Sequence, residues 1–353
     1  MGFNKVQLVV VDINSGGVRR SAETIKTEFA KLTGVKNVSV TSRVPGEWKI
    51  IPKVKVKSEA TSSAIGNDMY FMSADDQFLK TFEVGLVQGR NFSGANLGDS
   101  SAVLVNEAAS KLLGIKEATE QIIQIPSIDF SGNVSLFSQP FNARVIGIVK
   151  DFNFRSLRET VAPMVLAYQK NPVHNIDYFT SRILTNNTSE TLKQMEAVLQ
   201  KIDQEHLFEY NFLDKQWDLF YREDQKRQTI FIGIAIMTIL IACLGLFGLA
   251  TYAAEQRKKE IGIRKVLGAT VTSIVNMLSK DFLKLVLIAA IIAFPVAWLA
   301  MNSWLNDFAY RINLGWWVFV LAGVLAMVVA FITVSFQAVK AANANPVKNL
   351  RTE

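Results

Sequence analysis

Three long apolar stretches in the last third of the chain constrain its fold more than any other feature. They occupy residues 230–254, 282–301 and 316–339, and the first and the third contain no charged residue. Lys284, the only charge in the second, lies near one end, where its long stem can reach the interface. Because about 20 apolar residues in a helix span the hydrocarbon core, the sequence predicts three membrane helices rather than three buried helices of a soluble protein.

Charge is distributed unevenly along the chain. Residues 1–229 contain 27 Lys and Arg against 26 Asp and Glu, whereas residues 230–353 contain 11 against 5. The net charge of +7 therefore belongs almost entirely to the apolar third. There, contact with a membrane surface explains it better than binding of nucleic acid does.

The basic residues also predict the orientation of the helices. Most of those in the apolar third lie in the loop after the first stretch and in the tail, residues 340–353: Arg257, Lys258, Lys259, Arg264, Lys265, Lys280, Lys340, Lys348 and Arg351. The loop at residues 302–315 holds only Arg311, against Asp307. Since positively charged loops remain in the cytoplasm, the first loop and the tail are predicted to be cytoplasmic. The second loop and all residues before the first stretch are predicted to lie outside.

The start of the chain lacks the signal that this orientation requires. No basic segment precedes an apolar core of signal-peptide length, because the apolar run at residues 6–11 is short and ends at Asp12. We therefore expect a further membrane helix upstream of Met1 in the functional polypeptide. Alternatively, the chain would be a fragment of a longer protein, or an internal start within one.

Residues 1–212 are predicted to form an α+β domain. Alternation of apolar residues predicts strands at residues 5–13, 35–44, 53–59, 101–106, 143–152, 162–169 and 178–184. Helical spacing predicts helices at residues 21–34, 106–114 and 189–203. Residues 213–229, with a stripe of Leu213, Trp217, Phe220 and Tyr221, are predicted to be a helical stalk that continues into the first membrane helix.

The chain offers little material for catalysis. It has two histidines, His174 and His206, and one cysteine, Cys243, and it lacks the spacing of zinc, thiol-exchange or serine-hydrolase motifs. The adjacent Asp75 and Asp76 are interpreted as a capping feature at the start of a helix, and the histidines as solvated or capping groups. A phosphate-binding loop is also missing from the sequence. We expect no enzyme activity, no metal and no cofactor bound by this chain.

The segment between the first two membrane helices, residues 255–281, carries a second pattern. It begins EQRKKEIGIRKVLGAT. Five apolar residues are predicted to share one face of an amphipathic cytoplasmic helix: Ile263, Leu267, Val271, Ile274 and Leu278. Such a helix can lie on anionic lipid headgroups or dock into a cytoplasmic protein. Composition alone leaves both alternatives open.

This segment resembles the signature of FtsX-like permeases, the family that includes MacB-type ABC transporters. The residues that match the signature are Glu260, Ile261, Gly262, Arg264, Leu267, Gly268 and Ala269. The end of the chain is similar to the closing motif of the family through Ala342, Pro346, Leu350, Arg351 and Glu353. Within residues 1–212, the stretches LVQGRNF, AVLVNEAASKLLG and VIGIVKDFNFRSL resemble the MacB-like periplasmic core domain.

The resemblance implies an architecture and partners. Residues 230–353 would form an FtsX-like permease domain after a MacB-like extracytoplasmic core, in the bacterial inner membrane. The chain would be the C-terminal half of a tandem permease, lacking the first membrane helix of that half. A second permease half or copy and a periplasmic adaptor would be partners. ATP would be bound by a separate ATPase subunit, which is coupled through Glu260, Ile261, Gly262, Arg264, Lys265, Leu267, Gly268 and Ala269.

The resemblance also implies that the output is efflux or mechanotransmission, driven by movement of the extracytoplasmic domain. A non-transporting membrane receptor, or a regulator of extracytoplasmic cell-wall enzymes, is the alternative function. ATP-dependent movement of a substrate separates these two hypotheses. A membrane-anchored extracytoplasmic enzyme is the third, and it lacks a catalytic constellation.

Overall fold

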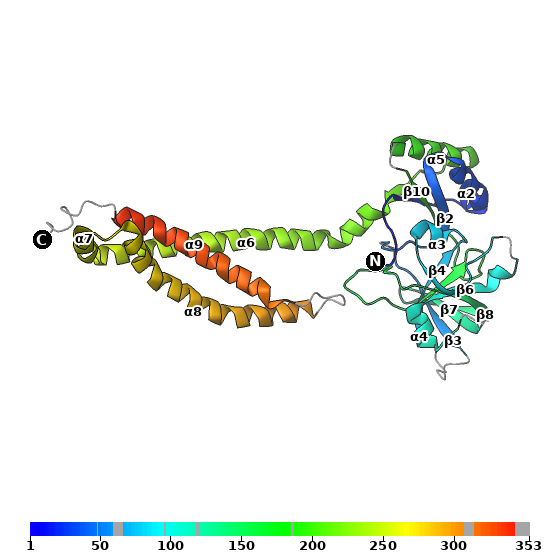
Figure 1. Ribbon diagram of the computed structural model, residues 1–353. Coiled ribbons are helices and arrows are strands. Elements are labelled where there is room, and N and C mark those ends of the chain that lie inside the picture. Colours follow the sequence, from blue (N-terminus) through cyan, green and yellow to red (C-terminus); the bar gives the residue numbers. More distant parts are fainter. Residues whose placement is uncertain are drawn as a thin grey trace. The chain divides into compact units, whose positions relative to one another are not determined.

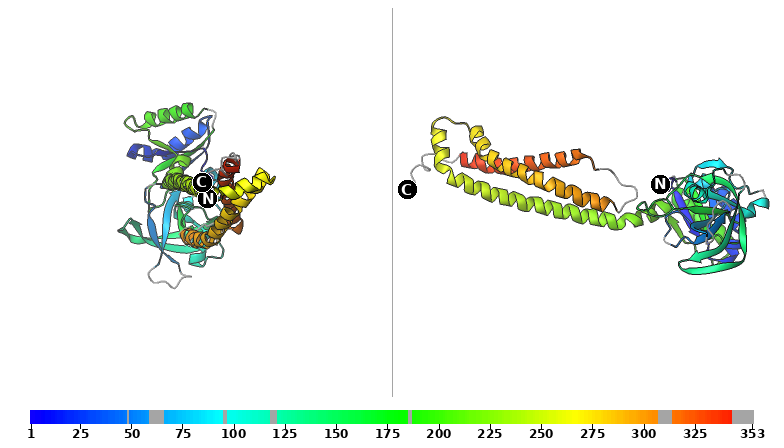
Figure 2. Two further views of the ribbon diagram at one scale, coloured as in Figure 1. Left: turned by 90° about the vertical axis from the view of Figure 1, so that its left-hand side faces the viewer. Right: turned by 90° about the horizontal axis from the view of Figure 1, so that it is seen from below.

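The structure is a computed structural model that describes residues 1–47, 49–58, 66–94, 97–117, 121–184, 187–306 and 314–342. The chain divides into two compact units, Met1–Arg222 and Glu223–Glu353, whose elements are drawn in Figure 1 and from two further sides in Figure 2. The first unit is an α/β domain, and the second consists of helices. The predicted fold class, an α+β domain followed by three apolar helices, is confirmed.

In the described residues of the first unit, eleven strands form one sheet. Their order is β11-β1-β10-β2-β4-β3-β7-β8-β6-β9, with β5 paired to β8. The bounds are β1 (Leu8–Asp12), β2 (Val35–Thr41), β3 (Lys53–Ser58), β4 (Asn67–Ala74), β5 (Leu86–Gly89), β6 (Ala102–Asn106), β7 (Ile122–Phe130), β8 (Asn133–Val149), β9 (Met164–Tyr168), β10 (Tyr178–Ile183) and β11 (Tyr210–Phe212). The helices are α1 (Gly16–Arg20), α2 (Ala22–Lys31), α3 (Phe78–Phe82), α4 (Glu107–Leu113) and α5 (Thr188–Ile202).

Six of these strands close into a ring. From β4 through β3, β7, β8 and β6 to β9, each strand pairs with the next, and β9 also pairs with β4 in parallel register. Alternate side chains of a strand point to opposite faces, so Met69 and Phe71 of β4 join one buried cluster while Met72 joins another. The first cluster takes side chains from all six strands and therefore fills the ring.

Of the five remaining strands, β5 pairs with β8 and four extend the sheet beyond the ring. These four are β2, β10, β1 and β11, and helices α2 and α5 cover one face of them. Phe29 of α2 packs against Phe179 of β10 with ring centroids 5.5 Å apart, and Met195 and Leu199 of α5 complete this cluster. The amphipathic spacing that predicts α2 and α5 thus places their apolar faces on the sheet.

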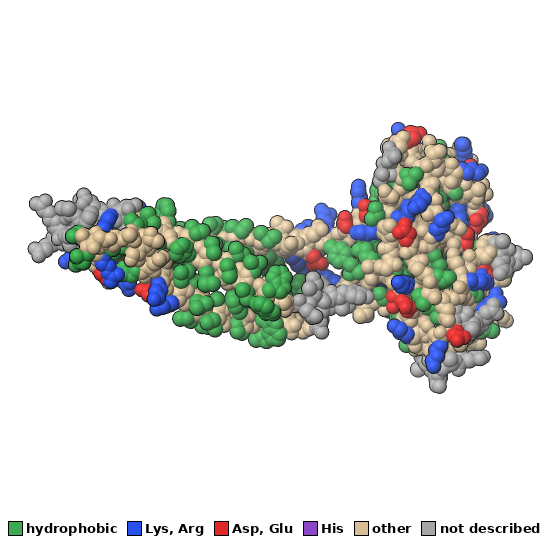
Figure 3. Space-filling view, viewed as in Figure 1, with side chains coloured by type: hydrophobic (Ala, Val, Ile, Leu, Met, Phe, Trp, Pro, Cys, Tyr) green, Lys and Arg blue, Asp and Glu red, His purple; other side chains and the backbone are tan. Residues whose placement is uncertain are grey.

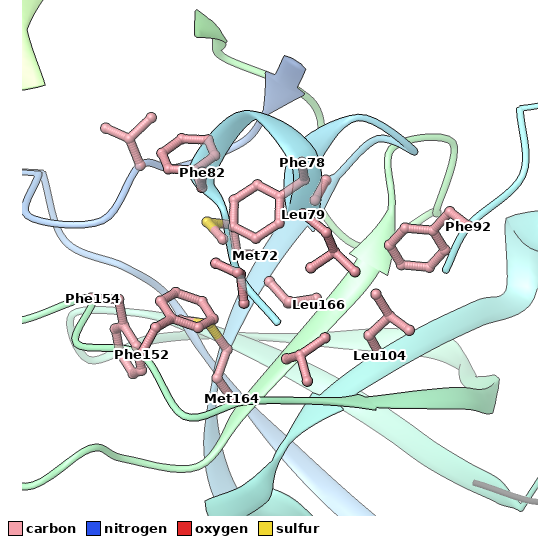
Figure 4. Close-up of a cluster of buried hydrophobic side chains, with 14 of the residues drawn as sticks. Met72, Phe78, Leu79, Phe82, Phe92, Leu104, Phe152, Phe154, Met164 and Leu166 are labelled. Carbon is pink, nitrogen blue, oxygen red and sulfur yellow. The ribbon is translucent and has the colours of Figure 1, made fainter. Parts of the chain in front are cut away.

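A third cluster lies on the outer face of the ring, under α3. Figure 4 shows Phe78, Leu79 and Phe82 of α3 with Leu104 and Leu166 of the neighbouring strands. Helix α6 (Leu213–Gln256) contributes to the same cluster from its first two turns. Leu213 and Trp217 are fully buried there, and the Trp217 indole donates a hydrogen bond of 2.9 Å to the carbonyl of Pro45. The start of α6 is therefore part of the core of the first unit.

Buried charges correct two interpretations of the sequence. Asp75 and Asp76 do more than cap a helix, because both form ion pairs with Lys26, at 2.6 Å and 2.9 Å. The side chain of Asp75 has no exposed surface. His206 is 6% exposed, so of the two predicted roles, solvated or capping, the solvated one is wrong for this residue. His174 is also largely buried, where its ring lies 5.2 Å from that of Phe130.

Four helices make up the described remainder of the chain: α6, α7 (Lys258–Val266), α8 (Val271–Leu305) and α9 (Trp316–Ala342). Three of them contain segments long and apolar enough to cross a membrane, Asp224–Gln256, Val271–Leu305 and Trp316–Lys340. Figure 3 shows their hydrophobic side chains and the Lys and Arg side chains near α7. Residues 213–229, predicted as a stalk, are helical and continuous with the first of these segments.

Helices α8 and α9 pack closely against each other. A Cβ atom at Gly323 would lie 2.9 Å from the ring of Phe294, and Phe294 packs on Phe319 with centroids 5.9 Å apart. On α9, Ala330, Val334 and Ala338 are buried. Two of these three are alanines, and small residues let membrane helices approach one another.

Candidate coupling site at α7

Helix α7 holds most of the residues of the predicted coupling motif. It begins one residue after α6 ends, with Arg257 at its N-cap. Glu260 and Arg264 form an ion pair of 2.6 Å one turn apart. Since exposed pairs of this kind contribute only about 0.3–0.5 kcal/mol, the pair mainly holds the two side chains along the helix. Arg264 also contacts the sulfur of Met277 in α8.

One face of α7 is anchored to its neighbours. Ile261 is 4% exposed and packs in a small cluster with Ile274 and Leu278 of α8 and Ala338 of α9. Gly262 is buried beside it. A further link is the ion pair of 3.2 Å between Arg257 and Asp281 of α8. Movement of α7 would therefore be passed directly to α8 and α9.

Gly268 ends α7. It has a φ of +90°, and the amides of Gly268 and Ala269 donate to the carbonyls of Lys265 and Arg264 at 3.1 Å and 2.9 Å. These two bonds form a Schellman motif, which requires a left-handed residue and so favours glycine. Thr270 then caps α8, accepting a hydrogen bond from the amide of Ser273.

This break corrects the predicted amphipathic helix. Ile263 and Leu267 lie before the break and are 52% and 80% exposed, whereas Ile274 and Leu278 lie after it and are buried. The five residues do not share one helical face. The glycine followed by a threonine cap was the signal in the sequence that marks the break.

The outward face of α7 is apolar. Ile263, Val266 and Leu267, which we call the docking stripe, follow the i, i+3, i+4 spacing of a single helical face and are 52%, 68% and 80% exposed. Arg264 and Lys265 lie in the same turn. Val266, Asp281 and Met277 are not among the predicted site residues, because the predicted helix runs across Gly268, where α7 ends.

The other predicted site residues fall into two groups. The structure brings Glu260, Ile261, Gly262, Arg264, Lys265, Leu267, Gly268 and Ala269 together in α7 and the turn that follows it. Pro346, Leu350 and Arg351 of the closing motif lie outside the described residues.

Replacing Gly268 with alanine is expected to destabilise the end of α7. A Cβ atom there would meet nothing within 4 Å, so the cost is that of a left-handed alanine, about 1–2 kcal/mol. Gly245→Ala in α6 is the matched control, because its Cβ also meets nothing within 4 Å but it lies inside a helix, where alanine is favoured. Thermal unfolding of the two variants in detergent, followed by circular dichroism, should show a loss only for Gly268→Ala. Equal losses would contradict the role assigned to this turn.

One family model matches part of the chain. Residues 232–346 match the model for the FtsX-like permease C-terminal domain. Curated proteins give no match to the chain. Among solved structures, the periplasmic region of MacB from Actinobacillus actinomycetemcomitans is 15% identical, with a TM-score of 0.40, and the match covers 62% of this chain and 94% of that one.

Two further solved structures are similar to the same degree. The extracellular domain of the noncanonic ABC-type transporter YknZ from Gram-positive bacteria is 14% identical, with a TM-score of 0.38 and coverage of 58% and 97%. A domain of a permease protein from Porphyromonas gingivalis is 17% identical, with a TM-score of 0.38 and coverage of 58% and 88%. The family match at residues 232–346 contains the larger part of the apolar segment of α6 and all of α7, α8 and α9, so this part of the chain is similar to the FtsX-like permease C-terminal domain.

Proposed function

We propose that this chain is the permease subunit of an ABC-type efflux or mechanotransmission system, and that a separate ATP-binding subunit docks on α7. The observation that carries the proposal is the docking stripe, three exposed apolar side chains on a helix that also carries basic residues. Exposed apolar side chains grouped on one face mark interaction sites. The i, i+3, i+4 spacing is that of a helix seated in a groove of another protein.

The anchoring of α7 supports a mechanical role. The face opposite the docking stripe carries Ile261, which packs with residues of α8 and α9. Helix α6 ends one residue before α7 and begins inside the core of the first unit at Leu213. A push on α7 would thus act on α8 and α9 and, through α6, on the extracytoplasmic unit.

The composition of the spans favours movement of the extracytoplasmic unit over passage of an ion. Residues 230–254 and 316–339 contain no ionisable side chain other than those of Cys243 and Tyr252, and Lys284 lies near an end of its span. Buried ionisable groups mark ion and proton pathways in membranes. In this proposal the chain lies in the inner membrane, with residues 1–222 outside and α7 in the cytoplasm, and it works with a second permease copy or half.

Leu267→Glu is expected to separate the chain from its ATP-binding subunit. A carboxylate in the centre of an apolar contact typically costs several kcal/mol unless it is paired, so recovery of the subunit with tagged full-length chain should fall by roughly tenfold or more. Gln225→Glu, an exposed position in α6 far along the chain from α7, is the control for added negative charge. The measurement is co-purification from cells that express both subunits, together with the ATPase activity of the purified complex.

The outcomes of this experiment separate the alternatives. Unchanged recovery of the ATP-binding subunit with Leu267→Glu would reject α7 as its docking site. If recovery falls but ATP-dependent release of substrate is absent for the wild type as well, the regulator of extracytoplasmic enzymes is favoured over efflux.

A further inference from the structure

A groove between α8 and α9 combines basic and apolar walls. The groove has a volume of about 420 Å³. It is lined by residues from the first turns of α8 and by residues of α9. Lys280, Lys284 and Ser279 of α8 line it, with apolar walls that include Leu287 and, from α9, Met327 and Phe331. None of the docking-stripe residues borders it.

The two lysines of the groove hold unneutralised charge. Lys280 and Lys284 are one helical turn apart, about 6 Å along the axis, and both are exposed. The neighbouring Asp281 is paired with Arg257. Within the part of the chain that the structure describes, neither lysine has a carboxylate partner. Two ammonium groups at this spacing can hold one phosphate between them.

Ser279 adds an independent sign of a ligand. Its side chain is 1% exposed and its hydroxyl has no hydrogen-bond partner among the described residues. A buried hydroxyl without a hydrogen-bond partner destabilises the folded state, and a polar atom entering the groove would remove this cost by accepting its hydrogen bond. A phosphate or glycerol oxygen placed beside the lysines could accept this hydrogen bond.

The apolar walls continue away from the lysines. Leu287 lies about 10 Å along the α8 axis from Lys280, and Met327 and Phe331 face the same space from α9. Lys280 and Lys284 lie at the cytoplasmic end of α8 in the predicted orientation. A charged head at that end and an apolar tail toward the membrane centre are the parts of a phospholipid.

We propose that this groove binds an anionic phospholipid of the cytoplasmic leaflet. Its phosphate lies between Lys280 and Lys284, an oxygen of the head accepts from Ser279, and one acyl chain lies along Leu287, Met327 and Phe331. Basic pockets between membrane helices on the cytoplasmic side bind lipid headgroups in this way.

A second copy of the chain fits the groove less well. Residues 230–254, 282–301 and 316–339 contain no Asp or Glu. A copy of these helices seated on the groove would therefore offer no carboxylate to Lys284, and burying an unpaired ammonium is costly. An anionic lipid supplies both the charge and the apolar chain.

The test uses purified full-length chain in detergent and three probes: phosphatidylglycerol, phosphatidylcholine and inorganic phosphate. Native mass spectrometry counts the lipids retained, and thermal unfolding follows stabilisation. Wild-type chain should retain phosphatidylglycerol in preference to phosphatidylcholine. The double variant Lys280→Gln/Lys284→Gln should lose this preference, with a fall in affinity of about tenfold or more, since each lysine near an anionic lipid contributes substantially.

The control is Lys258→Gln/Lys259→Gln, which removes two exposed charges from α7 outside the groove and should keep the preference. If both double variants lose the preference for phosphatidylglycerol equally, the lipid is attracted by the general positive charge of the chain, and the proposed site is overturned. Stabilisation by inorganic phosphate alone, or equal retention of phosphatidylcholine, would overturn the lipid. A last experiment introduces Leu287→Cys in a Cys243→Ala background and measures crosslinking between two copies of the chain. Crosslinking that phosphatidylglycerol does not suppress would show that protein covers the groove, and would also overturn the proposal.

Discussion

Trp217→Ala is expected to lower the free energy of unfolding of the first unit by about 3–5 kcal/mol, the usual cost of removing a large buried aromatic side chain. Trp217 is fully buried, its ring lies 5.6 Å from that of Phe3, and its indole donates to the carbonyl of Pro45. Hydrogen exchange of the strands in the full-length chain, read by mass spectrometry, measures the effect.

Leu219→Ala is the control for this prediction. Leu219 lies two residues further along α6 and is 62% exposed, so its truncation should change stability by less than about 0.5 kcal/mol. Equal protection of the strands in Trp217→Ala and Leu219→Ala would contradict the anchoring of α6.

Gly46 sharpens the prediction. Its φ is +79°, and a Cβ atom there would lie 2.1 Å from Nε1 of Trp217. Gly46→Ala should therefore be costly in the wild type, through both the clash and the left-handed backbone. In the Trp217→Ala background only the backbone cost of about 1–2 kcal/mol remains. The two substitutions should be strongly non-additive, as expected for residues in direct contact.

The elements that the sequence predicts are those in which periodicity and burial agree. Helices α2, α4 and α5 carry one apolar stripe each, β1, β6 and β9 are mostly runs of buried apolar residues, and β2 and β10 are largely buried strands that mix apolar and polar residues. For these, the local pattern is enough because one face must be buried against the sheet. The long apolar stretches of α6, α8 and α9 are predicted from their length and composition.

The elements missing from the sequence analysis depend on distant partners. Strand β7 contains Pro126, and the first half of β8 contains Pro140 and is mostly exposed, so neither shows clear alternation, and proline counts against a central strand. Strand β4 ends at Ala74, directly before Asp75 and Asp76. These two carboxylates are neutralised by Lys26 of α2, which is distant in sequence. The ring follows from the pairing of β9 with β4, which lie far apart in sequence.

At the candidate coupling site, the residues are predicted from the sequence and their orientation comes from the structure. The motif from Glu260 to Ala269 lies together as expected. Which side chains face outward depends on Gly268, whose left-handed backbone separates α7 from α8. A period of 3.6 read across this glycine assigned Leu267 to the same face as Ile274, although one is exposed and the other buried.

A pair of buried groups in the first unit should give opposite responses to pH. Burial raises the pKa of Glu47 to about 7, against the hydrogen bond from Tyr178 and the charge of Arg43. Burial, together with the charge of Arg43, lowers the pKa of His174 to about 4, while Asp177 acts in the opposite direction. Arg43 also pairs with Asp177, and Arg19 pairs with the same carboxylate, so these charges surround both groups.

The signs follow from proton linkage. Glu47 binds its proton more tightly in the folded state, so its stabilisation is complete below its usual pKa of 4.5 and is lost as pH rises to about 7. His174 binds its proton less tightly, so its stabilisation is complete above its usual pKa of 6.5 and is lost as pH falls to about 4. Each contribution amounts to about 3 kcal/mol, and the two slopes oppose each other between pH 4.5 and 6.5.

Single substitutions should therefore expose slopes that largely cancel in the wild type. Between pH 4.5 and 6.5, Glu47→Gln should make stability rise with pH relative to the wild type, because only the His174 contribution remains of the pair. His174→Gln should make stability fall over the same range. Urea unfolding of the full-length chain in detergent, followed by tryptophan fluorescence at a series of pH values, measures both. Parallel curves for wild type and both variants would show that neither group titrates differently in the folded and unfolded states.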